Sequence, residues 1–245
     1  AGNKYNHLFL ADASVAGGYY CYSITQDPVA DLGIEVGMTV KVTGPMAPYS
    51  GMQEIKGGQV AIVDSTIKTV EFVDITDKFT AGENLGVYVG LPVVIKGVEI
   101  GTQDLEKDTS QYLYFSIGEQ QGYVRTYITD FPTTLSADAK ATIDADHAAH
   151  FGYKADVTGI MITYSGKPYI IPTSVTPFTN YVEVQKTPTE KVDAELDALK
   201  FDASMSADAV IELLLTGKYY NDVTITWATD DTTGAASIAD GKLTI

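Results

Sequence analysis

Aromatic side chains recur at every second position in two neighbouring stretches of the chain, residues 111–117 and 122–128. The positions between them are apolar, as at Leu113 and Val124. Successive side chains of a strand point to opposite faces of a sheet, so the aromatic set is expected on one outer face. Aromatic rings stack on sugars or on nucleic-acid bases, the latter contributing ~1–3 kcal/mol per base. The predicted ligand-binding residues are Tyr112, Tyr114, Tyr123, Arg125 and Tyr127.

The charge of the chain bears on which ligand this face would take. Sixteen basic against 32 acidic residues give a net charge of −16, and Arg125 is the only arginine. Nucleic-acid binding relies on several cations that neutralise phosphates, so polysaccharide is the favoured partner. The tyrosines also admit a structural explanation, in which they stabilise the sheet or pack against a neighbouring domain. The equivalent face nearer the N-terminus is poorer: His7, Phe9, Tyr19, Cys21 and Ser23.

Two other groups of residues have side chains that bind metals. His147 and His150 lie three apart on a predicted helix, where they would share a face and could ligate a transition metal. Two histidines make an incomplete site, so a solvated helix end is favoured. Asp74, Asp77 and the pair Asp230–Asp231 offer carboxylates to calcium, but their spacing matches no EF-hand loop. We therefore predict neither a bound metal nor a cofactor.

Recognisable catalytic motifs are missing from the sequence. There is no G-x-S-x-G nucleophile elbow, and the loop Gly82–Gly86 lacks the lysine of a phosphate-binding loop. Cys21 is the only cysteine, and its setting YYCYSI is typical of a buried strand position rather than of a nucleophile. The sequence thus predicts a segment that binds and does not catalyse.

The elements that would position these residues are mostly strands. Apolar residues alternate or form short runs, rich in β-branched and aromatic types and closed by glycines. The clearest exception is Ser136–His150, an alanine-rich helix that Ser136 can cap. No apolar run is long enough to span a membrane. The predicted fold class is all-β.

A repeat organises these strands. Gly37–Ile55 reads GMTVKVTGPMAPYSGMQEI, and Gly152–Ile170, 115 positions later, reads GYKADVTGIMITYSGKPYI. Nine of the nineteen positions are identical without a gap. We expect two equivalent hairpins, in which Val42 and Val157 face a core and the shared Tyr-Ser-Gly makes the turn.

The repeated pattern, G-x-x-V-x-V-x-G followed by Y-x-G-x-x-x-I, resembles that of OB-fold accessory domains in large secreted bacterial proteins. The resemblance implies two Greek-key barrels in tandem, over residues 1–70 and 71–185, and ligand binding on the face of strands two and three. The second barrel is expected to be complete, with strands at Leu91–Ile100, Gln111–Ile117 and Gly122–Ile128 before the helix. The first has candidates at His7–Asp12 and Tyr19–Ile24 but lacks its first strand.

Residues 186–245 form a third predicted region. After a polar linker at Gln185–Val192, the segments Thr224–Trp227 and Asp240–Thr244 resemble two strands of a bacterial immunoglobulin-like domain. That resemblance implies a partial β-sandwich in which Trp227 is a core residue.

Together these features predict a non-catalytic binding or spacer segment of a larger extracellular or cell-surface bacterial protein, which grips polysaccharide. Two alternatives stay open. The barrels could guide nucleic acid into a secreted nuclease, or the missing first strand could be donated by a neighbouring subunit of a polymeric surface protein. The incomplete first barrel and sandwich are expected if the chain is a fragment.

Overall fold

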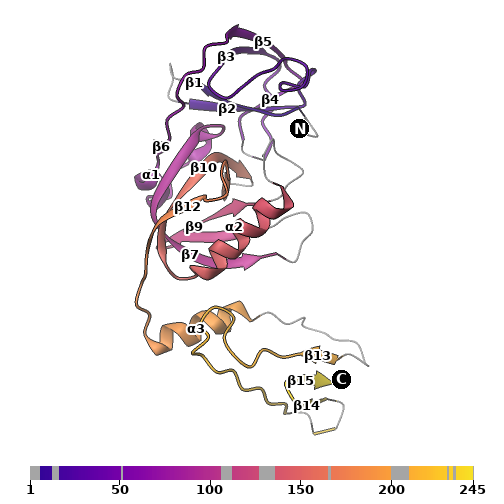
Figure 1. The fold of residues 1–245 in the computed structure, drawn as a ribbon, viewed down its shortest axis with the longest axis vertical. Helices are drawn as coiled ribbons and strands as arrows, with labels where there is room; N and C mark the ends of the chain where they lie inside the picture. Colours follow the sequence, from indigo (N-terminus) through magenta and orange to yellow (C-terminus); the bar gives the residue numbers. More distant parts are fainter. Residues whose placement is uncertain are drawn as a thin grey trace. The chain divides into compact units, whose positions relative to one another are not determined.

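The computed structural model describes residues 6–12, 17–50, 52–105, 112–126, 136–164, 167–199, 210–230, 232–233 and 236–244. The chain divides into two compact units, Ala1–Glu183 and Val184–Ile245. Strands predominate in the described chain as a whole, as Figure 1 shows, so the all-β prediction is confirmed.

A closed five-stranded barrel forms the larger part of the first unit. Its strands follow the ring order β7-β8-β9-β11-β10, and pairing of β10 with β7 closes the ring. The β9–β11 pair is parallel and the other four are antiparallel. This is a Greek-key order, with α2 between the third and fourth strands. The strands are β7 (Pro92–Asp104), β8 (Tyr112–Ile117), β9 (Gln120–Arg125), β10 (Lys154–Tyr164) and β11 (Lys167–Ile171).

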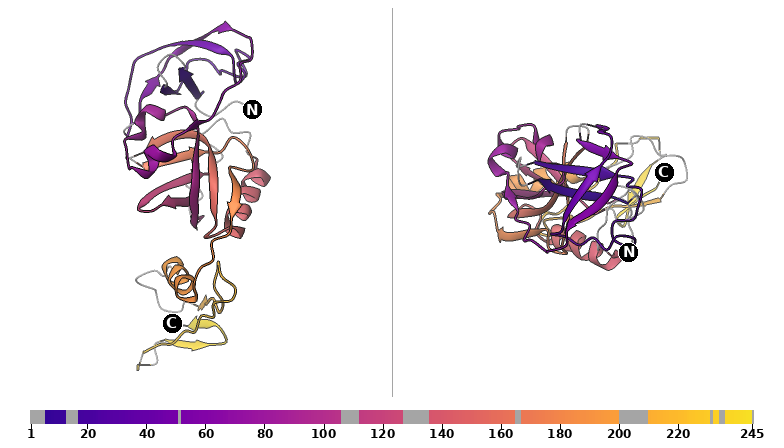
Figure 2. Two further views of the ribbon diagram at one scale, coloured as in Figure 1. Left: turned by 90° about the vertical axis from the view of Figure 1, so that its left-hand side faces the viewer. Right: turned by 90° about the horizontal axis from the view of Figure 1, so that it is seen from above.

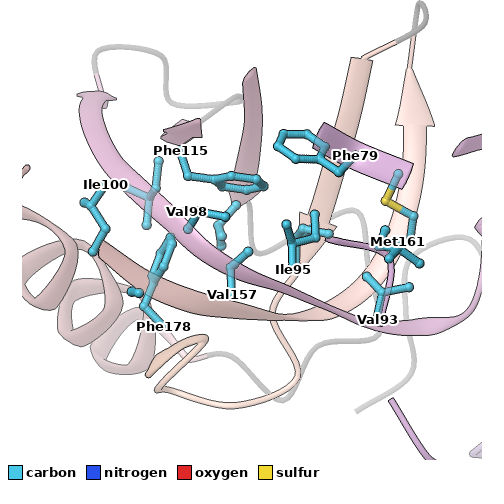
Figure 3. Packing of buried hydrophobic residues seen from close by; sticks show 14 of the residues in the cluster. Phe79, Val93, Ile95, Val98, Ile100, Phe115, Val157, Met161 and Phe178 are labelled. Carbon is cyan, nitrogen blue, oxygen red and sulfur yellow. The ribbon is translucent and has the colours of Figure 1, made fainter. Parts of the chain in front are cut away.

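The barrel closes around the apolar positions that alternate along these strands. Ile95, Phe115 and Val157 are fully buried, and Figure 3 shows their side chains in one interior cluster. The Phe115 ring lies 5.7 Å from that of Phe79 and 6.5 Å from that of Phe178. Burial of such side chains contributes about 1.5–3 kcal/mol each, which makes this cluster the main source of stability.

Four shorter elements flank the barrel: β6 (Val73–Asp74), α1 (Thr76–Thr80), the 3-10 helix η1 (Leu85–Tyr88) and β12 (Phe178–Val182). The helix α2 (Ala137–Ala149) packs against the barrel through Ile143 and is seen from two further directions in Figure 2. The Ser136 side chain accepts a hydrogen bond from the Ala139 amide, so the predicted cap is confirmed.

The first half of the unit contains the other copy of the repeat. Met46 pairs with Ile55 and Tyr49 with Met52, which are the counterparts of the β10–β11 pairs Met161–Ile170 and Tyr164–Lys167. The two copies therefore form hairpins in the same register, as predicted. The strands of this half are β1 (Leu8–Asp12), β2 (Gly17–Tyr22), β3 (Thr39–Thr43), β4 (Glu54–Lys56) and β5 (Gln59–Asp64).

The strands of this first half also share the barrel's pairing rules. β2 pairs antiparallel with β1 and parallel with β4, as β9 does with β8 and β11. Among the described residues, however, β1-β2-β4 and β3-β5 remain separate sheets, and no described strand precedes β1. The first half thus has the arrangement of the barrel without a counterpart of β7.

The two halves pack closely against each other. A Cβ atom on Gly18 would lie 2.4 Å from the Val89 carbonyl oxygen, and one on Gly90 would lie 2.5 Å from that of Tyr19. Gly90 also has φ +85° and donates its amide proton to the Met161 carbonyl, at 2.8 Å. Only glycine fits this approach, which joins the outer faces of both halves into one apolar cluster.

The second unit contains α3 (Pro188–Ala198) and a small sheet, β13 (Val210–Glu212), β15 (Lys242–Thr244) and β14 (Ser237–Ala239) in that order. Asp240 and Gly241, both with positive φ, make the turn between β14 and β15. The buried Glu195 carboxylate fixes α3 by accepting backbone hydrogen bonds of 2.5–2.7 Å from residues 218–220.

Two expectations for this region are wrong. The predicted linker Gln185–Val192 contains the start of α3, because Thr187 and Glu190 form a capping box. Trp227 is only half-buried, and its indole Nε1 donates to the Leu214 carbonyl oxygen at 2.6 Å. Thr224 makes an isolated bridge to Thr216 instead of beginning a strand. A core tryptophan needs a second sheet above it, which the described residues do not form.

Candidate ligand-binding surface

The alternation read from the sequence is present in β8 and β9. Leu113, Phe115 and Val124 are fully buried inside the barrel, so the residues between them lie on its outer face. The strand register places Tyr112 opposite Arg125 and Tyr114 opposite Tyr123. Four of the five predicted residues are therefore adjacent, and Tyr127 lies outside the described residues.

The structure adds three tyrosines that the sequence analysis did not include. Tyr169 of β11 lies beside Tyr123, with ring centroids 4.9 Å apart, because these strands pair in parallel. Tyr164 lies 6.1 Å from Tyr169, and Tyr49 of the other hairpin lies 6.0 Å from Tyr164. We call this continuous row the tyrosine ladder: Tyr49, Tyr164, Tyr169, Tyr123, Tyr112 and Tyr114.

Burial varies along the ladder. Tyr123 and Tyr169, in the middle, are only 5% and 8% exposed. Tyr49 and Tyr164, at one end, are 54% and 41% exposed. The buried rings therefore hold the sheet face in place, while the exposed pair offers its ring surfaces to solvent. This arrangement combines the two explanations that the sequence left open, since some tyrosines pack and others are accessible.

Hydrogen bonds and burial favour the neutral form of three tyrosines of the ladder. A hydrogen bond with Tyr164 raises the pKa of Tyr49, and burial raises the pKa of Tyr114 and of Tyr169. These hydroxyls are neutral at physiological pH and can both donate and accept. The Lys167 ammonium lies 5.7 Å from the Tyr123 ring centroid, and its hydrogen bond to that hydroxyl raises the pKa of Lys167. The surface is thus aromatic and hydroxyl-rich, with a cation at its edge.

The prediction for the equivalent face of the first half is partly wrong. Phe9 is on the outer face as expected, but its partner across the sheet is Tyr20, not Tyr19. Cys21 pairs with Leu8 and points into the core, and Ser23 follows the end of β2. The sequence YYCY fits either alternation, so only the pairing with β1 decides which residues face outward.

Cys21 and His7 are titratable residues of the first half whose side chains are buried. The Cys21 thiol is fully buried, as predicted, and burial raises its pKa to about 12. His7 is also buried, and its Nδ1 forms a hydrogen bond with the Tyr20 hydroxyl. Burial lowers the pKa of His7 to about 4, which keeps the imidazole neutral.

The two helix histidines do not form a metal site. His147 is fully buried beside Phe178, and its Nε2 makes a 3.0 Å hydrogen bond with the Tyr114 carbonyl oxygen. His150 instead stacks on the Tyr181 ring at 3.8 Å. The two histidines are three residues apart on α2, but the His147 ring points into the core while the His150 ring stacks on Tyr181. No cluster of three potential metal ligands occurs within the described part of the chain.

The carboxylates that the sequence offered as calcium ligands either bind other side chains or lie in separate elements of the structure. Asp74 accepts from the Lys96 ammonium at 2.8 Å and from the Thr76 hydroxyl at 2.6 Å, which lowers its pKa to about 2. Asp77 belongs to the first turn of α1. Asp230 is exposed, and Asp231 lies outside the described residues.

Comparison with known proteins gives little further information. No family model and no curated protein matches the chain. One solved structure, "Structure of murine DNA binding protein bound with ds DNA", covers 73% of this chain and 86% of its own, at 10% identity and a TM-score of 0.28. Likeness at that level carries no argument about function. No described helix is long and apolar enough to cross a membrane.

Proposed function

We propose that this segment binds polysaccharide through the tyrosine ladder and holds it for other parts of a larger extracellular bacterial protein. The observation that carries the proposal is the continuity of the ladder from the buried pair Tyr123–Tyr169 to the exposed pair Tyr49–Tyr164. Rings that are fixed before the ligand arrives lose little conformational freedom on binding. In this role the segment supplies recognition, and catalysis belongs to another domain.

The chemistry of the ladder favours sugars over nucleic acid. Sugar rings present apolar faces that stack on tyrosine and hydroxyls that pair with phenol groups. Nucleic acid needs a row of cations along its phosphates, and the cations that the described residues place against the ladder rings are Lys167 and Arg125. The net charge of −16 opposes a polyanion further.

Affinity electrophoresis in gels that contain neutral or acidic polysaccharides tests this proposal. We expect at least one polysaccharide to retard the protein. Tyr164→Ala should weaken that retention by about tenfold and Tyr49→Ala by somewhat less, because each removes an exposed ring and leaves the buried rings in place. Tyr219→Ala removes a tyrosine of the second unit and should leave retention unchanged.

Two results would overturn the proposal. One is the absence of retention by every polysaccharide, and the other is retention that neither ladder variant reduces. A gel shift with single-stranded DNA at low and high salt runs in parallel. A shift that disappears steeply with salt would instead support the nucleic-acid alternative.

A further inference from the structure

A cavity of about 430 Å³ lies at one end of the barrel, apart from the outer face that carries the ladder. Three segments surround it: the loop that joins α1 to η1, the start of β9 at Gln120 and Gln121, and the β10–β11 hairpin at Thr163 and Pro168. We call it the mouth pocket. Ligand sites commonly enclose about 300–1,000 Å³, and the volume of the mouth pocket lies within that range.

Thr163 is the most buried polar residue that lines the mouth pocket. Met161 and Thr163 both point inward from β10, and Thr163 is 6% exposed. Its Oγ1 is buried and has no hydrogen-bond partner among the described residues. A buried hydroxyl without a partner is destabilising, and a ligand hydroxyl that pairs with it would remove that penalty.

Side-chain amides provide the other polar groups of the pocket. Gly82 has φ +66° and no side chain, and a Cβ atom there would lie 3.1 Å from the Gln120 Nε2. This glycine therefore leaves room for the Gln120 carboxamide at the pocket wall. The Asn84 Oδ1 accepts from the Gly86 amide at 2.9 Å, so the Asn84 amino group is what remains to donate to a ligand.

The remaining walls are apolar or neutral. Phe79 lines the pocket and is held against Phe115, and Leu85 and Pro168 complete the apolar lining. The only charged residue of the lining is Glu83, which the Lys78 ammonium pairs at 3.0 Å. No cation lines the cavity, so a phosphate or carboxylate ligand is disfavoured. A ligand that has neutral hydroxyl groups and an apolar ring face matches these amides and apolar walls.

We propose that the mouth pocket binds one neutral sugar residue, with a sugar hydroxyl on Thr163 Oγ1 and further hydroxyls on the amides of Gln120 and Asn84. This site is independent of the ladder. Thr163 and Tyr164 are consecutive in β10, so they point to opposite faces of the strand. The pocket would therefore take a single sugar unit at a place separate from the exposed pair Tyr49–Tyr164 of the ladder.

An NMR titration of the whole chain with glucose, galactose, mannose and N-acetylglucosamine tests the inference, with glycerol as a small polyol for comparison. We expect one sugar to give saturable shifts of the backbone amides of residues 82–86 and 120–121. Thr163→Val keeps the shape of the side chain and should lower the affinity by about tenfold or more. Thr158→Val, on the same strand outside the pocket, should leave it unchanged.

Gln121→Trp provides a second test, because Gln121 is an exposed residue at the rim and a larger ring there should block entry. The inference is overturned if no sugar gives saturable shifts, which would mean that the pocket holds only water. It is also overturned if both variants bind as the wild type does. Tyr164→Ala should weaken polysaccharide retention by about tenfold yet spare monosaccharide binding, so failure of the ladder and failure of the pocket are distinguishable.

Discussion

The two copies of the repeated hairpin share their register but differ in what surrounds them. In the second copy, β10 pairs with β7 on one side and the hairpin completes a closed ring. In the first copy, β3 pairs with β5, and the described strands leave two separate sheets. Accordingly Val157 is fully buried, whereas its counterpart Val42 is only partly buried. A hairpin can thus be specified locally, while its stability depends on the strands that enclose it.

The largest expected difference concerns the paired glycines of the repeat. A Cβ atom on Gly159 would lie 2.4 Å from the Ile171 carbonyl oxygen, and one on Gly44 would lie 2.7 Å from the Gly58 Cα. Gly159→Ala should destabilise the closed barrel by about 3 kcal/mol, and Gly44→Ala should cost less, about 1–2 kcal/mol, because its Cβ atom would meet the backbone at a longer distance. Native-state hydrogen exchange of β10 and β2 amides measures each half separately. Equal losses would contradict the comparison.

The second prediction uses the two buried histidines, one in each half. The pKa values of His7 and His147 both lie near 4, lowered from about 6.5 by burial. Between these pH values the unfolded chain takes up protons that the folded chain does not, so stability falls as the pH drops from 6.5 to 4. Each histidine should account for on the order of 3 kcal/mol.

Hydrogen exchange as a function of pH checks this assignment, and each half has its own variant. His147→Gln should flatten the pH dependence of β10 amides while leaving that of β2 amides, and His7→Gln should do the reverse. If one variant flattened the pH dependence of the amides in both halves, the two halves would unfold as a single cooperative unit.

The smallest expected difference comes from the paired valines. Val157→Ala removes a fully buried side chain from a closed core and should cost about 2 kcal/mol. Val42→Ala removes a partly buried one and should cost less than about 1 kcal/mol. Urea denaturation of the two variants gives both values. A larger loss for Val42→Ala would show that the first half is closed by residues outside the described ones.

Much of the barrel could be predicted because its strands have a clear local pattern. The alternation of Tyr112 to Ile117 assigned both faces of β8 correctly, and Ser136 marked the start of α2. The pattern failed where two alternations fit equally well, as at Tyr19 and Tyr20. It also failed for Trp227, where a short resemblance was extended to a strand that the described residues do not form.

The candidate site was predicted less completely. β8 and β9 are neighbours in the chain, so Tyr114 and Tyr123 could be placed together. Tyr169 and Tyr49 come from segments far apart in sequence, and nothing local indicates that their rings meet. The shared Tyr-Ser-Gly of the repeat was the one available signal, since it placed Tyr49 and Tyr164 at equivalent positions.

The sequence by itself determined the strand character, the repeated hairpin and the capped helix. Each of these depends on residues that are close together in the chain, within one helical turn or within two consecutive strands. Tertiary structure alone decided which hairpin is enclosed, which tyrosines are exposed and where the mouth pocket opens. Those properties depend on parallel pairing of β9 with β11 and on the close approach at Gly18 and Gly90. Such contacts join segments that are distant in the chain, and periodicity within a strand contains no information about them.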